Sequence, residues 1–396
     1  MNFKKIITSA LSIALLSTTL SACANNNQNA GNTSTDKSSG DKEIITVWTS
    51  GSENVKTTWE KLASGFNANE EYNQGKYQMN LQHVSSGTGA TSLSDRVISQ
   101  YKSGKEDSEF DLIETNGGEY EIYTKEGGED IFLNIDKSKL KNADRVISDQ
   151  LAEGGEVQVP YRGTTVVLAY NEEMVPNPPK TAEELYKWIK ENDGKFAYNT
   201  PGSGGAGNSF VTTAIYNQLD EQALHSSDEK WKDEWDKGFA LLEELHPHLY
   251  QSGGSVVYPH KNQGALDLLA NQQISMTPAW VDMIISQLDQ GTLPETIKIT
   301  QIDPGFTGSL VNLAIPSNSK HADGAYAIID YIISDEAQSL LVDEMGAFPV
   351  VDMSGISSKN KELMSSFDIS SFRTVDIGEL GAELVERWDQ DIATLK

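Results

Sequence analysis

The stretch Ile44-Ile45-Thr46-Val47-Trp48, with the units that follow it as far as Phe110-Asp111-Leu112-Ile113, decides the fold class. Ile44 to Trp48 has the β-branched and aromatic composition of a strand, and residues 59–66 carry a helical pattern. A strand at 77–84 and a helix at 93–101 precede the short buried strand at 110–113. This β-α-β-α-β order predicts a mainly parallel sheet with helices on both faces.

A second α/β unit is expected further along the chain. Predicted strands lie at 164–170, 195–198, 274–277, 297–301 and 310–316. Thr181 and Glu184 have the spacing of a capping box and predict a helix start. Near the end of the unit, Ser334 is expected to cap a helix. The helix before it is predicted from apolar residues that recur at helical spacing, namely Ala325, Ile328, Ile329, Ile332 and Ile333.

The patterned region from residue 43 to residue 396 exceeds what one hydrophobic core usually organises, so two lobes are expected. The chain is predicted to cross between them near 162–164 and again near 306–309.

The N-terminus has the layout of an export signal. Lys4 and Lys5 precede a mostly apolar run, which ends at Leu20-Ser21-Ala22-Cys23 and holds the one cysteine of the sequence. The run is too short and polar for a bilayer-spanning helix. Its end resembles a lipobox, which implies a leader at 1–22 and diacylation of Cys23. Residues 23–42 are rich in Asn, Ser, Thr and Gly and are expected to form a flexible tether.

The formal net charge of -27 excludes several classes of partner. Loss of Lys4 and Lys5 with the leader would take the charge to -29. Nucleic acids need clusters of Lys and Arg, so no nucleic-acid partner is expected. Broad adhesion to anionic lipid is disfavoured too, which leaves the two acyl chains on Cys23 as the membrane contact.

Candidate ligand residues follow the predicted strands, because ligands of open α/β sheets gather beyond the carboxyl ends of strands. These loops mix small polar donors with aromatic and charged side chains. The candidates there are Trp48, Ser50, Ser52, Ser86, Glu114, Asn116, Trp280 and Asp282. Tyr161 and Arg162 at the first crossing and Thr307 at the second are further candidates.

A glycine-rich segment at 201–209 precedes the apolar stripe of a predicted helix and contains Ser203, Gly204, Gly205 and Asn208. Backbone N–H groups at such a helix start suit a phosphate, phosphonate or carboxylate, with Arg162 as a partner. A flexible loop with a Ser or Asn cap is the alternative. The Lys-Ser/Thr ending of a nucleotide-binding P-loop is absent.

Aromatic and acidic candidates point to a different ligand chemistry. Trp48, Tyr161 and Trp280 suit a ring or an ammonium group, and core packing is the alternative for each. Glu114 and Asp282 are expected to pair a cationic group, unless they are solvated charges or helix caps. No metal site is expected, because His246-Pro247-His248 has no adjacent carboxylate or cysteine ligand.

Several of these features together resemble the bacterial extracellular solute-binding proteins of ABC importers. The resemblance covers roughly residues 43–348. The residues that carry it are the lipobox and tether, Tyr170-Asn171, Pro178-Pro179-Lys180-Thr181, Glu184-Leu185 and the glycine-rich stretch before Phe210. A second set is similar to the YnjB-like group, a neighbour of the thiamine-, polyamine- and ferric-iron-binding proteins: residues 290–294, 306–316, 321–322 and 334–338. Tyr258 is followed by Pro259 and not by a second tyrosine, which argues against iron.

The resemblance implies a two-lobed, type II periplasmic-binding-protein fold, in which each lobe is a mainly parallel sheet flanked by helices. Lobe 1 would take residues 43–163 and 309–347, and lobe 2 residues 164–308 and 348–396. The ligand would sit between the lobes, and the protein would be a monomeric, cofactor-free receptor that delivers it to two permease and two ATPase subunits. It would be anchored on the extracellular face of the cytoplasmic membrane, which is the periplasmic side in a Gram-negative cell.

The ligand stays open at this point. A thiamine-like compound satisfies both the anionic and the cationic predictions, and a polyamine satisfies the second alone. A sugar, a sugar phosphate or a phosphonate is an alternative. An exported hydrolase is the rival from the enzyme class, although no Gly-x-Ser-x-Gly or His-Glu-x-x-His motif is present. A surface adhesin or signalling receptor that kept the fold is a third possibility.

Overall fold

The computed structural model describes residues 42–85, 91–106, 108–147, 151, 154–367 and 373–395. The predicted leader, Cys23, Ser86 and the predicted tether up to residue 41 lie outside the described residues. No helix within the described ranges is long and apolar enough to cross a membrane.

Strands and helices alternate along most of the described chain. The strands are β1 (Glu43–Gly51), β2 (Tyr77–Ser85), β3 (Leu112–Asn116), β4 (Gln158–Asn171), β5 (Gln251–Ser252), β6 (Ser255–Val256), β7 (Met276–Trp280), β8 (Ile297–Thr300), β9 (Gly308–Ala314) and β10 (Phe348–Pro349). The α-helices are α1 (Glu53–Ala68), α2 (Glu70–Asn73), α3 (Leu93–Lys102), α4 (Gly117–Ile122), α6 (Ala182–Glu191), α7 (Gly205–Tyr216), α8 (Asp236–Leu245), α9 (Lys261–Ala270), α10 (Val281–Asp289), α11 (Ala322–Ile332), α12 (Asp335–Met345), α13 (Lys361–Ser365) and α14 (Leu380–Asp391).

One mixed sheet runs through the described chain in the order β10-β4-β9-β3-β1-β2, and β7 and β8 join it by pairing with β4. β1 pairs in parallel with β2 and with β3, and Val47 faces Leu112 across the second pair. The predicted β-α-β-α-β unit is therefore confirmed as a parallel arrangement.

The expectation of a mainly parallel sheet in each lobe is wrong beyond this unit. β4 pairs antiparallel with β7, β8, β9 and β10, and β3 pairs antiparallel with β9. The connection from β8 to β9 spans only residues 301–307 and contains no helix. β9 therefore continues in the direction of β8, and both strands pair antiparallel with β4.

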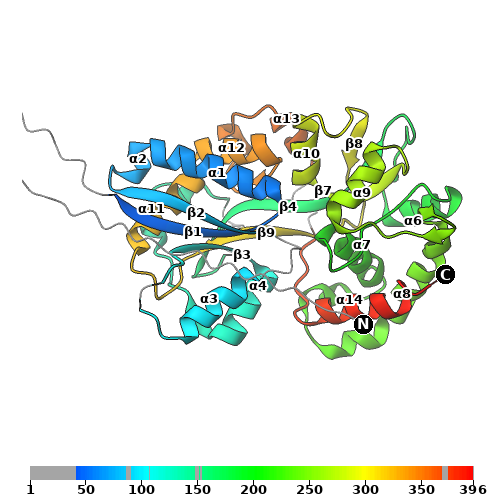
Figure 1. The fold of residues 1–396 in the computed structure, drawn as a ribbon, viewed down its shortest axis with the longest axis horizontal. Helices are drawn as coiled ribbons and strands as arrows, with labels where there is room; N and C mark the ends of the chain where they lie inside the picture. The colour runs from blue at the N-terminus through cyan, green and yellow to red at the C-terminus, as the bar shows by residue number, and fades with distance from the viewer. Residues whose placement is uncertain are drawn as a thin grey trace, which may run out of the picture. The chain divides into compact units, whose positions relative to one another are not determined.

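The two segments predicted to cross between lobes lie side by side in the sheet. Gly163 pairs with Leu310 and Thr164 with Ser309 in the β4–β9 ladder. β4 is 14 residues long; its first part pairs with β9 and its second part with β7 and β8. Figure 1 shows β4 and β9 running through the middle of the described chain.

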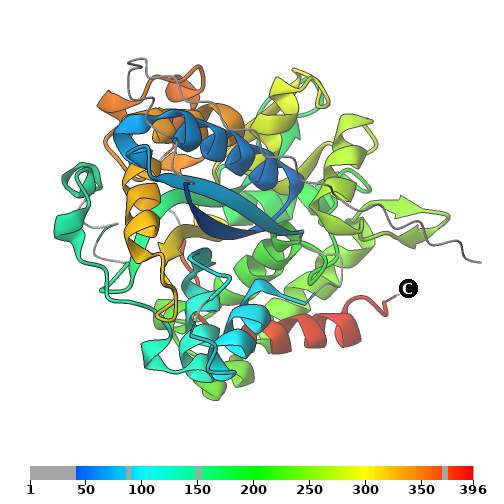
Figure 2. The same cartoon turned by 60° about the vertical axis from the view of Figure 1, so that its left-hand side comes forward.

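Helices cover both faces of the β1–β2–β3 part of the sheet. α1 and α11 pack on one face, and α3 and α4 lie on the other, as Figures 1 and 2 show from two directions. α1 is helical because apolar residues recur on one side of it, and five of these are buried: Val55, Trp59, Leu62, Ala63 and Phe66.

Two predicted helix caps are present. Ser334 Oγ accepts a hydrogen bond from the Ala337 N–H at the start of α12. Thr181 Oγ1 accepts from the Glu184 N–H at 3.1 Å, while the Glu184 carboxylate accepts from the N–H of Lys180 and not from that of the cap residue. The predicted strand at 195–198 is wrong, since Phe196 makes only an isolated bridge to Met276.

The buried apolar residues form two large clusters and a smaller one. The first cluster includes α1, α11, α12 and the inner face of β1, and it also takes in residues of α10. The second includes α6, α7 and α8, and α14 packs into it through Leu380, Leu384 and Trp388. The residue bounds of the two lobes stay a prediction.

Candidate functional site

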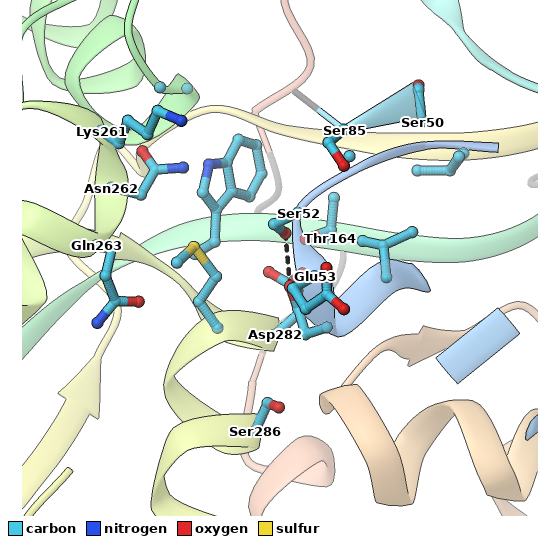
Figure 3. A pocket seen from close by; sticks show the side chains of 18 of the residues that line it. Ser50, Ser52, Glu53, Ser85, Thr164, Lys261, Asn262, Gln263, Asp282 and Ser286 are labelled. Carbon is cyan, nitrogen blue, oxygen red and sulfur yellow. Dashed lines mark hydrogen bonds between the residues drawn. The ribbon is translucent and has the colours of Figure 1, made fainter. Parts of the chain in front are cut away.

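A cavity of about 770 Å³ opens where strand ends meet helix starts. Its wall is formed by the β1–α1 turn, the ends of β2 and β3, parts of β4 and β9, the segment before α7, and the starts of α9 and α10 (Figure 3). Small-molecule sites range from roughly 300 to 1,000 Å³ and favour such strand ends, so the cavity has the size and position of a ligand site.

One side of the cavity, which we call the acidic wall, consists of Glu114 on β3, Arg162 and Thr164 on β4, and Asp282 in the first turn of α10. All four are buried, with Glu114 4% exposed and Asp282 6% exposed. Charged side chains are almost never buried to this extent unless they are paired.

Arg162 and Glu114 form a buried ion pair supported by aromatic hydroxyl and indole groups. Arg162 Nη2 donates to Glu114 Oε1 at 3.0 Å, and Arg162 Nε donates to the Tyr161 hydroxyl at 2.8 Å. That hydroxyl donates to Glu114 Oε1 at 3.0 Å and accepts from Trp59 Nε1 at 3.2 Å. Tyr161 is completely buried behind the wall, where it holds the pair in one geometry.

Three oxygens of the acidic wall have no hydrogen-bond partner within the described part of the chain. They are Glu114 Oε2, Asp282 Oδ1 and Thr164 Oγ1, and all three atoms are shielded from solvent. A buried polar atom without a partner costs about 1–3 kcal/mol, so a donor bound here would be favoured. Burial raises the pKa of Asp282 above its ordinary value, although Arg162, Asn54 and the backbone N–H groups of Asp282 and Met283 oppose that effect.

Asn54 connects the acidic wall to the start of α1. Its Nδ2 donates to Asp282 Oδ2 at 2.9 Å, and its Oδ1 accepts from Ser52 Oγ at 2.5 Å. This link occupies one carboxylate oxygen of Asp282 and leaves the other, Oδ1, without a partner.

Glu119 adds a titratable group at the edge of the acidic wall. It forms a capping box with Asn116 at the start of α4: the Asn116 side chain accepts from the Glu119 N–H, and the Glu119 carboxylate accepts from the Asn116 N–H. Burial and the nearby Glu114 carboxylate raise the pKa of Glu119 to about 7.

The facing side of the cavity, which we call the glycine wall, consists of residues 202–205 and Asn208 together with Lys261, Asn262 and Gln263 of α9 (Figure 3). α7 begins here at Gly205 without a side-chain cap of its own. Instead the Ala206 N–H donates to Asn262 Oδ1 at 3.1 Å, and the Gly202 N–H donates to Asn208 Oδ1 at 2.6 Å. Protein amides thus already use part of the predicted anion site.

Close packing explains several glycines of this segment. A Cβ on Gly207 would lie 1.9 Å from the carbonyl oxygen of Asn199, and one on Gly204 would lie 2.9 Å from the backbone nitrogen of Asn262. At Gly205 a Cβ would lie 2.8 Å from Cζ2 of Trp280, so the indole lies directly against the start of α7.

The structure brings most of the predicted ligand residues to the cavity wall. These are Ser50, Ser52, Glu114, Asn116, Arg162, Ser203, Gly204, Gly205, Asn208, Trp280 and Asp282. The ligand contacts themselves stay a prediction, and Ser86 and Cys23 lie outside the described residues.

Three predicted ligand residues lie away from the cavity wall. Tyr161 is behind it, as described above. Trp48 packs on Phe110 with ring centroids 5.0 Å apart, and its Nε1 donates to the carbonyl of Glu109 at 3.0 Å. The Thr307 N–H donates to Ser209 Oγ at 2.8 Å.

Sequence reasoning did not select several side chains that line the cavity, among them Glu53, Asn54, Glu119, Lys261 and Asn262. The Asn116-x-x-Glu119 spacing of a capping box could have identified Glu119. Lys261 and Asn262 open a helix that has no capping pattern in the sequence, so no local signal marked them.

Within the described ranges, no group of three or more His, Cys, Asp or Glu side chains could hold a metal ion. The two histidines of the predicted loop have other partners. His248 Nδ1 lies 2.6 Å from Asp193 Oδ1, and His246 Nδ1 lies 2.8 Å from the Tyr258 hydroxyl.

Comparisons with known proteins agree with this architecture. Residues 70–359 match the family model described as bacterial extracellular solute-binding protein. Protein YnjB of Escherichia coli is 25% identical over 195 residues, which are 45% of this chain and 46% of YnjB, so the match spans about half of that relative.

Solved structures share the fold at low sequence identity. An extracellular solute-binding protein from Bordetella parapertussis has a TM-score of 0.67 at 16% identity and covers 88% of this chain and 98% of its own. The spermidine/putrescine-binding protein PotD of Streptococcus pneumoniae gives 0.64 at 14% identity, with 88% and 99% covered. The ferric ion-binding protein A of Pasteurella haemolytica gives 0.63 at 16%, with 89% and 99% covered.

Proposed function

The chain belongs to the bacterial extracellular solute-binding proteins, and from that premise we propose that it is the receptor of an ABC transporter for a small polar ligand with a cationic group. The family is non-enzymatic, so the protein acts by binding. One observation carries the ligand class: Glu114 and Asp282 are buried at the cavity, and each has a carboxylate oxygen without a partner.

The charges of the cavity wall support a cation. Four carboxylates line it, on Glu53, Glu114, Glu119 and Asp282, against the single buried guanidinium of Arg162 and the ammonium of Lys261. An ammonium group placed at the two unpartnered oxygens would form charge-assisted hydrogen bonds, which are about twice as strong as neutral ones. A polyamine or a thiamine-like compound fits this chemistry. The indole face of Trp280 could stack on the ring of a thiamine-like compound or contact an ammonium group.

Delivery to the membrane follows the same premise. In this proposal, ligand binding favours closure of the two lobes around the cavity, and the closed form is presented to the permease and ATPase subunits. A diacylated Cys23 would hold the receptor at the extracellular face of the membrane, with residues 24–42 as the tether.

The test is a thermal-unfolding screen of the full chain against polyamines, thiamine and its phosphates, neutral sugars and phosphonates. A ligand at about 100 times its Kd adds about 2.7 kcal/mol to the free energy of unfolding, and it should be recovered unchanged. We expect an amine-containing member to give the largest shift.

A matched pair of variants assigns that shift to the acidic wall. Asp282→Asn should weaken the amine ligand by at least about 30-fold, or roughly 2 kcal/mol. Asp289→Asn, on the same helix but paired with Lys359 at the surface, should leave the affinity unchanged. Stabilisation by sugars alone, with Asp282→Asn as tight as the wild type, would overturn the cationic assignment. Turnover of the ligand would overturn the receptor function.

A further inference from the structure

We propose that the ligand of this cavity is bipolar, with an anionic phosphate or carboxylate group bound by Lys261 on the glycine wall while its cationic group is bound at the acidic wall. This inference rests on the proposed receptor function and adds a second binding residue to the same site.

Lys261 is a charged side chain of the cavity wall without a counter-ion. Within the described residues, its Nζ makes no ion pair and no hydrogen bond, and Figure 3 shows its side chain directed into the cavity. Arg162, the other basic residue of the cavity wall, already has a counter-ion in Glu114 and donates a second hydrogen bond to the Tyr161 hydroxyl. The free positive charge of the cavity therefore lies at Lys261.

Asn262 offers a second donor beside it. Its Oδ1 accepts from the Ala206 N–H, which fixes the orientation of the carboxamide and makes the other terminal atom Nδ2. No described residue accepts a hydrogen bond from Nδ2. An ammonium and an amide N–H₂ group on consecutive residues are two donors for the oxygens of one anionic group.

The backbone of Lys261 is held in place by the glycine wall. Ser203 Oγ accepts from the Lys261 N–H at 3.0 Å and donates to the carbonyl of Thr200 at 2.6 Å. Lys261 has a φ of +60°, a left-handed conformation that favours glycine. A lysine at a position better suited to glycine is consistent with a binding role for its ammonium group.

The two walls differ in sign, which is why we assign two ligand groups. Figure 3 places Lys261 and Asn262 across the cavity from Ser52 and Thr164. Glu114 Oε2, Asp282 Oδ1 and Thr164 Oγ1 are unpartnered and more than nine-tenths buried, so the acidic wall also awaits a ligand group. Its net negative charge would repel an anion, whereas Lys261 would repel a second ammonium group.

The experiment compares two probes that share one ammonium group, ethanolamine and phosphoethanolamine, by titration calorimetry on the full chain. The wild type should bind phosphoethanolamine at least tenfold more tightly than ethanolamine. Lys261→Met should weaken phosphoethanolamine about tenfold and leave ethanolamine within twofold. Lys261→Arg should retain most of the preference, and Lys298→Met, which removes an ammonium paired with Glu172 at the surface, should retain all of it.

Lys261→Gly separates the charge from the fold. Glycine accepts a φ of +60° without strain, so this variant should keep the wild-type midpoint of thermal unfolding while it loses the preference for phosphoethanolamine. A preference that survives in both Lys261→Met and Lys261→Gly would overturn the inference.

The wild type alone gives two further outcomes. If it binds ethanolamine as tightly as phosphoethanolamine, the assignment of an anionic ligand group to Lys261 is overturned, and the receptor function stands. If it binds neither probe, the bipolar assignment is overturned, and the thermal-unfolding screen alone decides the receptor function.

Discussion

The acidic wall and the glycine wall face the same cavity but are built on different principles. The acidic wall places four buried side chains on β3, β4 and α10, and Tyr161, itself bound by Trp59, fixes Glu114 and Arg162 from behind. The glycine wall consists of partly exposed residues at two helix starts, where glycines allow the backbone segments to approach closely.

This difference separates two ways of preparing a binding site. Buried charges cost free energy unless they are paired, so the acidic wall is preorganised and each change in it should be expensive. The glycine wall depends on backbone packing and on one free ammonium, so its geometry and its chemistry can be changed separately. The following predictions test that contrast, from the largest expected effect to the smallest.

Glu114→Gln should break the acidic wall. It keeps the shape of the side chain but leaves the Arg162 guanidinium buried without its counter-ion, which costs about 3–5 kcal/mol of unfolding free energy. Urea denaturation measures this loss. Glu383→Gln, which breaks an ion pair with Lys232 near the surface, is the control and should cost less than about 1 kcal/mol. Equal losses in the two variants would show that the buried network is not a unit.

Glu119→Gln should remove a pH dependence from the edge of the acidic wall. The pKa of Glu119 is raised from 4.5 to about 7, so the folded state favours its protonated form. The stability that this group contributes is fully present below pH 4.5 and is lost as the pH rises through 7. It amounts to at most about 3.5 kcal/mol, since one pKa unit corresponds to about 1.4 kcal/mol.

The measurement is the unfolding free energy of the wild type minus that of Glu119→Gln, taken from about pH 4 to pH 8. We expect this difference to fall with rising pH. A difference for Glu119→Gln that does not change between pH 4.5 and pH 7 would contradict the raised pKa.

Gly207→Ala should distort the glycine wall without changing any charge. The new Cβ would lie 1.9 Å from a backbone carbonyl, and such overpacking typically costs about 1–3 kcal/mol. Gly118→Ala is the matched control, because the nearest atom to its Cβ would be 3.8 Å away. Thermal unfolding followed by circular dichroism should show a lower midpoint for Gly207→Ala alone; equal midpoints for the two variants would refute the packing explanation.

Trp48→Phe should have the smallest effect, because Trp48 belongs to neither wall. It removes the hydrogen bond from Nε1 to the Glu109 carbonyl, which contributes about 1 kcal/mol to stability. The affinity for the ligand found in the screen should stay within twofold of the wild type. A larger loss of affinity would place the indole in the site after all.

Local sequence patterns predicted the elements of this fold better than their assembly. The periodicity of Val55, Trp59, Leu62 and Phe66 marks α1, and the strand–helix rhythm before residue 113 predicts its parallel pairings, because both signals lie within one segment. The antiparallel pairing of β4 could not be predicted in the same way. It depends on which distant strands lie beside β4, and no pattern within one segment specifies them.

The candidate site divides along the same line. Glu114 follows a predicted strand and was accessible to sequence reasoning, because strand ends gather at one place in the fold. Arg162 was selected at the predicted crossing between the lobes. Lys261 and Asn262 were not, since they start a helix without a capping pattern and reach the cavity only because α9 packs beside α7.

By itself, the sequence determined the class of the fold, its acidic character and the chemical types of side chain available for a ligand, since these depend on composition and on short-range periodicity. The tertiary structure decided which of them face one another. It paired Glu114 with Arg162, moved Trp48 and Thr307 away from the cavity, and placed Lys261 across from the acidic wall. Burial and pairing depend on contacts between residues far apart in the chain, and these determine whether a carboxylate is a neutralised partner or an open binding group.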